Sequence, residues 1–256
     1  MQGSDPADGD RLLAELASFA ERVLPRCPPD IDPHHFGSRL GGYQYLAIAA
    51  EAVGLASGAT ILDWGAGFGH VSFLLARLGA RVEAYDVTHR FEEIDRTLLD
   101  TPGVRFARRP PDEPMPYEEG QFTIALSVGT LEHVTDEARA LADVRRVLAP
   151  GGRFLIYHLP NRRSYIEAIA KRAGKFYHER AYTPASATAL LQGHGFAVER
   201  VTPYHVLPRS SISRLGAMRS FSEKHYRGID AFDAALAKIP PLSFFVTAFT
   251  IHARRT

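Results

Sequence analysis

Three glycines alternate with other residues directly after a short apolar run. The run ATILDW covers residues 59–64, and Gly65, Gly67 and Gly69 follow it before a stretch with helical apolar spacing. Because glycine has no Cβ atom, such a turn can bend sharply and let a ligand lie against its backbone. Asp86 stands seventeen residues after Gly69, at the end of the next apolar run, where a carboxylate can accept hydrogen bonds from both hydroxyls of a ribose. The spacing favours a site for a nucleoside-bearing cofactor over a turn that only packs a helix on a strand.

The position of the third glycine separates two classes of cofactor. A dinucleotide site has the pattern G-x-G-x-x-G/A, whose third small residue lets the helix approach the strand. Here His70 occupies that position, and the third glycine comes one residue earlier, at Gly69. A NAD(P)-dependent Rossmann oxidoreductase is therefore the weaker alternative. The pattern G-x-G-x-G resembles motif I of the class I S-adenosylmethionine-dependent methyltransferases, whose cofactor has no phosphate.

Four segments farther along the chain extend this resemblance. They are MPY at residues 115–117, QFT at 121–123, TLEHV at 130–134 and VRRVLAPGGRFLI at 144–156. Their order is typical of the small-molecule branch of the family, which includes ubiquinone- and menaquinone-biosynthesis methyltransferases. The stretch from Thr183 to Val201 resembles the late helix and sixth strand of that branch. This chain departs from the pattern twice: Thr123 replaces the usual aspartate, and Pro111 stands where an acidic residue often contacts adenine.

The rest of the pattern predicts the elements that position these residues. From residue 59 onward, short apolar runs alternate with segments of helical spacing, which indicates a parallel sheet with helices on both faces. The resemblance implies a Rossmann-like α/β fold with seven mostly parallel strands, an antiparallel last strand and a helical insertion before it. We expect an N-terminal helical cap or lid over residues 1–58 and a cofactor-binding core over 59–160. Residues 161–256 would carry substrate-covering helices and the last two strands.

The cofactor that the resemblance implies is S-adenosylmethionine, with S-adenosylhomocysteine as its product. Asp86 would bind the ribose, and Asp112 would contact the adenine. At the methionine end, Asp63 would face the amino group, Ser127 would offer a backbone carbonyl, and Arg39 would meet the carboxylate. The full set of expected cofactor-binding residues is Asp63, Gly65, Ala66, Gly67, Gly69, Asp86, Val87, Asp112, Ser127 and Arg39.

Methyl transfer from a sulfonium is an in-line displacement, so most of the rate would come from aligning the acceptor, the methyl group and the sulfur. A hydroxyl acceptor also needs a base, and histidine suits that role near neutral pH. The resemblance places His133 beside the methionine end, which makes it the expected catalytic residue and favours O-methylation; carbon and nitrogen acceptors stay open. The alternative for His133 is local packing at a helix entry. We expect Tyr43, His158 and Asn161 to contact the substrate, with Tyr43 in a segment, 34–45, that is either a lid or a docked helix entry.

Composition and charge narrow the range of partners. With 45% apolar residues the 256-residue chain can fill a large core, and a formal net charge of +1 gives it no strong attraction for DNA. Its single cysteine excludes a disulfide framework and a multi-thiolate zinc site, and no metal site is predicted. Residues 161–180 hold six basic and two acidic side chains, a local excess of +4. That excess is either a solvated face or a contact for an acidic or carrier-bound acceptor. RNA is not expected as a partner.

The sequence as a whole favours a methyltransferase that acts on a small molecule in specialised metabolite, lipid or glycan biosynthesis. No apolar run is long enough to cross a bilayer, and the first ten residues lack the pattern of a secretory signal. We therefore expect a cytoplasmic enzyme. Two alternatives remain open: a NAD(P)-dependent Rossmann oxidoreductase, and a protein that binds S-adenosylmethionine without turning it over.

Overall fold

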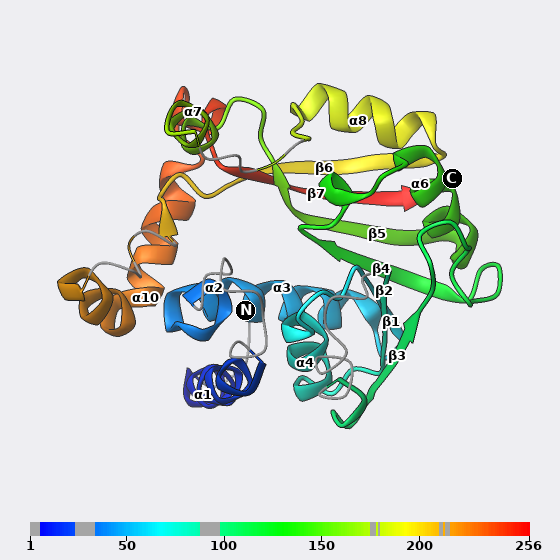
Figure 1. The fold of residues 1–256 in the computed structure, drawn as a ribbon, viewed down its shortest axis with the longest axis horizontal. Coiled ribbons are helices and arrows are strands. Elements are labelled where there is room, and N and C mark those ends of the chain that lie inside the picture. Colours follow the sequence, from blue (N-terminus) through cyan, green and yellow to red (C-terminus); the bar gives the residue numbers. More distant parts are fainter. Residues whose placement is uncertain are drawn as a thin grey trace.

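A seven-stranded sheet forms the centre of the computed structural model (Figure 1). The structure describes residues 6–23, 34–87, 98–174, 178, 180–209, 212 and 216–256. The strands lie in the order β3-β2-β1-β4-β5-β7-β6, and only β7 is antiparallel to its neighbours. The strands are β1 Ile61–Trp64, β2 Val82–Asp86, β3 Val104–Arg108, β4 Phe122–Val128, β5 Leu148–Pro160, β6 Phe196–Tyr204 and β7 Ala248–Arg255. The predicted Rossmann-like sheet with an antiparallel last strand is confirmed.

Helices cover both faces of this sheet. Apolar side chains of α1, α3 and α4 share a core with one face, and those of α6 and α8 share a second core with the other (Figure 1). The helices are α1 Pro6–Val23, α2 His34–Gly37, α3 Arg39–Ala56, α4 His70–Arg77, α6 Glu137–Val147, α7 Tyr165–Arg172, α8 Pro184–Gly193 and α10 Gly216–Leu236. The segment of helical apolar spacing at residues 88–99, between β2 and β3, lies mostly outside the described residues.

The carboxyl ends of three neighbouring strands meet at one edge of the sheet. In β1 all four residues are buried, as expected for a central parallel strand that is covered on both faces. Asp63 of β1 lies opposite Ala84 of β2 and Leu126 of β4. The glycine turn after β1, Asp86 at the end of β2 and the residues after β4 therefore come together. Open α/β sheets bind their ligands at such an edge.

Of the N-terminal helices, α3 packs on the sheet, and α1 and α2 pack on α3. The Ser38 hydroxyl accepts a hydrogen bond from the Gly41 N–H at 3.0 Å and so caps the start of α3. Phe36 and Leu40 on either side of this cap are fully buried. Segment 34–45 is thus docked on the core in this structure, and its role as a lid stays a prediction. The domain boundaries at residues 58 and 160 stay predictions.

Helix α10 fills the connection between β6 and β7, so the predicted helical insertion before the last strand is confirmed. Its Tyr226 ring meets the Tyr43 ring of α3 edge-on, with 5.1 Å between centroids. This contact ties the C-terminal part of the chain to the N-terminal helices. Among the described residues, no helix combines the length and the apolar character that a bilayer crossing requires.

Candidate functional site

The turn between β1 and α4 has a backbone that suits glycine. Gly65, Gly67 and Gly69 have φ angles of +78°, +52° and +74°, in the left-handed region that other residues avoid. A Cβ atom on Gly65 would overlap the Thr130 side chain, and one on Gly69 would overlap Leu98, so these two glycines also serve packing. At Gly67 the nearest atom to a Cβ is the Gly65 carbonyl oxygen, 3.9 Å away. The backbone at Gly67 therefore offers room for a ligand to approach closely.

Asp86 lies against this turn. Its Oδ2 accepts a hydrogen bond from the Gly67 N–H at 2.7 Å, and its Oδ1 accepts one from the Val87 N–H, also at 2.7 Å. Two backbone donors on opposite oxygens fix the plane of the carboxylate. The group that the sequence assigns to a ribose is thus held beside the open glycine.

A cavity of about 600 Å³ opens next to the turn. Five of the residues that the sequence singles out line it together: Gly65, Asp86, Val87, Asp112 and His133. Much of the remaining wall is apolar and includes Trp64, Tyr85, Met115 and Val134. A concave, largely apolar space of this size with a few convergent polar groups is typical of small-molecule and cofactor sites. S-adenosylmethionine fits this arrangement. The Asp86 carboxylate could accept hydrogen bonds from its ribose, and the open backbone at Gly67 would leave room for the cofactor to lie against the turn.

Asp63 and Ser127 lie beneath the turn. The Ser72 hydroxyl of α4 donates to Asp63 Oδ2 at 2.5 Å, so the carboxyl ties β1 to α4. Complete burial raises the pKa of Asp63 to about 6. The Ser127 hydroxyl is also fully buried and has no hydrogen-bond partner among the described residues. Asp63 thus has a structural task in addition to the predicted contact with the methionine amino group, and both predicted cofactor contacts stay predictions.

The structure does not bring Arg39 to the glycine turn. Its guanidinium lies 3.6 Å from Asp10 Oδ1 of α1 and packs over the Tyr226 ring of α10, 5.8 Å from the centroid. Both contacts belong to a separate, smaller cavity between the N- and C-terminal helices. The predicted contact between Arg39 and the methionine carboxylate gains no support from this placement.

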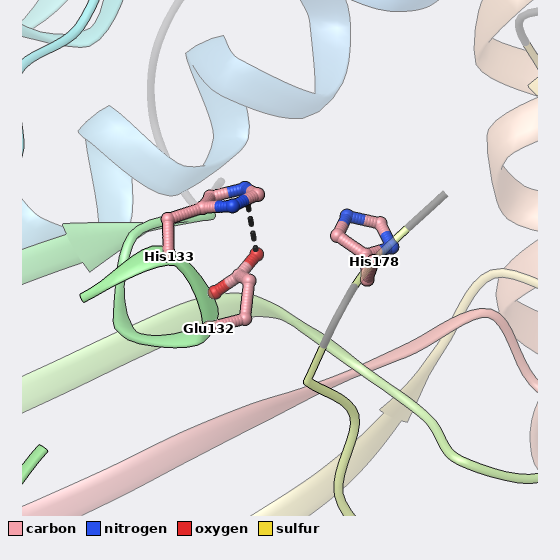
Figure 2. Close-up of side chains that lie close together, drawn as sticks. All are labelled: Glu132, His133 and His178. Atoms are coloured by element: carbon pink, nitrogen blue, oxygen red, sulfur yellow. Dashed lines mark ion pairs between the residues drawn. The ribbon is translucent and has the colours of Figure 1, made fainter. Parts of the chain in front are cut away.

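His133 ends the 3-10 turn η2, Leu131–His133, which follows β4. The side chain of His133 is 61% exposed, whereas that of its neighbour Glu132 is 2% exposed, and Glu132 Oε1 lies 3.9 Å from His133 Nε2. Burial raises the pKa of Glu132 to about 7. The ring of His178, from the segment after α7, lies 5.7 Å from that of His133 between centroids (Figure 2). Sequence reasoning missed His178, because no motif surrounds it and 45 residues separate it from His133.

The three predicted substrate residues lie at different places. His158, at a φ of +59°, stacks on Tyr204 with 5.1 Å between ring centroids and meets the Tyr45 ring edge-on at 5.3 Å. The Asn161 amide donates to the carbonyls of Phe244 and Val246 at 2.9 and 2.8 Å, which uses it to hold the segment before β7. Tyr43 faces Tyr226, as described above. None of the three lines the cavity beside the glycine turn.

A buried polar group beside His158 also escaped the sequence analysis. His205 Nδ1 lies 2.9 Å from Asp233 Oδ2, and its Nε2 lies 2.9 Å from Gln44 Oε1. Burial lowers the pKa of His205 to about 4, so the ring is neutral at pH 7. These side chains come from α3, from the residue directly after β6 and from α10, and only the folded chain brings them together.

Residues 62–156 match the family model described as "Methyltransferase domain". The sterol 4-C-methyltransferase strm-1 of Caenorhabditis elegans is 25% identical over 180 residues, which cover 69% of this chain and 53% of that protein. The demethylmenaquinone methyltransferase of Tropheryma whipplei is 31% identical over 121 residues, 46% of this chain and 49% of that protein. The chain thus spans about half the length of these curated relatives.

One solved structure illustrates the similarity of fold. It is a SAM-dependent methyltransferase from Thermotoga maritima, described as a possible histamine N-methyltransferase. It superimposes with a TM-score of 0.58 at 19% identity, over 94% of this chain and 99% of that one. At this level of identity the match supports the arrangement of strands and helices.

Proposed function

We propose a methyl-transfer function on the premise that residues 62–156 of this chain belong to the class I S-adenosylmethionine-dependent methyltransferases. The chain transfers a methyl group to a small-molecule acceptor and releases S-adenosylhomocysteine. The observation that carries the proposal is the single cavity in which the glycine turn, Asp86 and His133 meet. When bound, S-adenosylmethionine supplies an electrophilic methyl group, and the chain has to hold and align the two reactants.

The proposed roles follow from the positions of the residues. Asp86, oriented by the Gly67 and Val87 N–H groups, accepts hydrogen bonds from the ribose hydroxyls. Gly67 leaves its backbone open to the cofactor, and Asp112, which lies on the cavity wall, is the proposed contact for the adenine. The apolar wall excludes water, which strengthens these polar contacts. Alignment of this kind can contribute about 7 to 11 kcal/mol to lowering a barrier.

We propose O-methylation as the finer reaction, because His133 is the titratable side chain on the cavity wall best suited to accept a hydroxyl proton near neutral pH. Its exposed ring reaches solvent, to which the proton can pass. Similarity to enzymes named for sterol and menaquinone substrates supports an acceptor among small, largely apolar molecules. A carrier-bound or acidic acceptor would fit the basic excess of residues 161–180.

Calorimetric titration with S-adenosylmethionine and with NADH tests the cofactor. We expect S-adenosylmethionine to bind and NADH not to bind, and the reverse result would restore the oxidoreductase alternative. Incubation with pools of phenols, hydroxylated quinones, sterols and amines then tests turnover through release of S-adenosylhomocysteine. Binding without release from any pool would favour the alternative of a protein that holds the cofactor and does not turn it over.

A further inference from the structure

Three side chains beside the cavity carry atoms that could bind a metal ion, although no sequence motif predicts a metal site here. Glu132 and His133 come from η2 after β4, and His178 comes from the segment after α7 (Figure 2). Each offers one ligand atom, and the three atoms lie within 4.8 Å of one another. We propose that these residues bind one divalent transition-metal ion. Two imidazoles and one carboxylate are typical donors for zinc and for non-haem ferrous iron.

The carboxylate of Glu132 is the strongest indication of a cationic partner. Its side chain is 2% exposed, and its Oε2 has no hydrogen-bond partner within the described part of the chain. Burying a carboxylate without compensation is costly, so buried carboxylates are normally paired or coordinate a metal. In Figure 2 one carboxylate oxygen of Glu132 faces the His133 ring, and the His178 ring lies beside this pair. A cation between them would supply the missing compensation.

The second histidine is oriented as metal-binding histidines usually are. His178 Nδ1 lies 2.7 Å from Oε1 of Glu167, a buried residue of α7. Histidines that bind metals almost always donate their other ring N–H to a carboxylate, carbonyl or water, which fixes the tautomer. With its proton on Nδ1, His178 presents the lone pair of Nε2 as a ligand. Glu167 is thus a positioning residue for the proposed site.

The spacing of the ligand atoms is compatible with closure around an ion. Ligands bound to zinc at about 2.0 to 2.2 Å in a tetrahedral arrangement stand roughly 3.4 Å apart. The atoms of the cluster lie within 4.8 Å of one another, so their separations exceed those of a loaded site by at most about 1.4 Å. Since the His133 side chain is 61% exposed, its ring can rotate toward Glu132 and His178 without disturbing the core.

The proposed metal site does not depend on methyl transfer. It uses one residue of the cavity wall, His133, while His178 and Glu167 lie outside that wall. Metal ions and protons compete for ring nitrogens, so a loaded site and His133 acting as a base are alternative states of one residue.

The test is metal binding by the untagged 256-residue chain. Equilibrium dialysis against Zn²⁺ with a chromophoric chelator as competitor gives stoichiometry and affinity, and Co²⁺ gives a visible spectrum that reports nitrogen and oxygen ligands. We expect one ion per chain. Loss of a group that only hydrogen-bonds to a metal ligand typically lowers metal affinity about 10- to 100-fold. The Zn²⁺ affinity should therefore fall by about tenfold in Glu167→Gln, and by more than about 100-fold in His178→Ala and in Glu132→Gln, which each lose a ligand.

A control variant and a test of folding accompany these measurements. His225→Ala removes an exposed histidine on α10 and should bind Zn²⁺ as the wild type does. Circular dichroism checks that each variant is folded, and calorimetry with S-adenosylmethionine should be unchanged in His178→Ala. Absence of stoichiometric Zn²⁺ and Co²⁺ binding by the wild type overturns the site, as does unchanged binding by the double variant Glu132→Gln/His178→Ala. Either result leaves the proposed methyl transfer standing, because cofactor binding is measured separately.

Discussion

The two sides of the candidate site are built in different ways. On one side, the glycine turn and Asp86 lie within 22 residues of each other, and backbone N–H groups hold them together. On the other side, Glu132 and His133 meet His178 and Glu167, and this side depends on where a helix and its following segment pack. The first side is specified by local backbone geometry, the second by tertiary packing. The difference implies that the turn side should tolerate changes elsewhere, while the histidine side should respond to them.

The largest expected effect comes from the histidine side. His133→Ala should lower kcat by about 100- to 10,000-fold with a hydroxyl acceptor, the usual contribution of a positioned base. The affinity for S-adenosylmethionine should stay near that of the wild type, because Asp86 and the turn are untouched. Single-turnover kinetics and calorimetry measure the two quantities. An unaltered kcat would mean that His133 has only a structural role, so that only the turn side of the site would be functional.

The next effect concerns stability on the turn side. Burial raises the pKa of Asp63 from 3.8 to about 6, so between these pH values the folded chain binds more protons than the unfolded one. The stability present below pH 4 is therefore lost as the pH rises through 6, by something on the order of 3 kcal/mol. Asp63→Asn, which can still accept from Ser72, should be more stable than wild type at pH 7 by up to that amount.

Urea unfolding at a series of pH values tests this expectation. The gap between Asp63→Asn and the wild type should close as the pH falls toward 4. Parallel stability curves over the same range would show that the buried carboxyl is not the source of the loss. If the predicted contact with the methionine amino group is correct, the same variant binds S-adenosylmethionine more weakly, and stability and affinity change in opposite directions.

A smaller effect is expected at the ribose contact. Asp86→Ala removes charged hydrogen bonds that are typically worth about 1.5 to 3 kcal/mol. This corresponds to a loss in affinity for S-adenosylmethionine of about 10- to 150-fold. Asp100→Ala removes an exposed acidic residue and serves as the matched control. Equal affinities for the two variants would remove Asp86 from the cofactor site.

The contrast between the two sides also explains what could be predicted from the sequence. Alternating apolar runs and helical periods predicted the sheet and its helices, because burial on both faces imposes that pattern. The turn and Asp86 were predictable because their backbone requirement restricts residue type within a short segment. The order of the four segments from residue 115 onward predicted the family and the placement of His133 after β4.

Other contacts depend on distances that no local pattern encodes. Arg39 pairs with Asp10 because α1 packs beside α3, and nothing in the residues near either one indicates that pairing. The Asn161 side-chain amide donates hydrogen bonds to the carbonyls of Phe244 and Val246, more than 80 residues away. His178 meets His133 only in the folded chain, where its ring also contacts Glu167 of α7. Such contacts follow from tertiary packing. The sequence indicates which residue types are present but does not predict which of them meet.

The smallest effect separates backbone strain from ligand contact within the turn itself. Gly67 and Gly79 both have positive φ angles, +52° and +89°, and a Cβ on either meets no atom closer than 3.9 Å. Gly67→Ala and Gly79→Ala should therefore each cost about 1 to 2 kcal/mol of stability, the usual penalty for a left-handed residue with a side chain. Only Gly67→Ala should also weaken S-adenosylmethionine binding, because its methyl group would occupy the space left for the cofactor. Thermal melts and calorimetry on the pair decide the matter, since equal affinities would mean that the open backbone at Gly67 serves the turn and not the ligand.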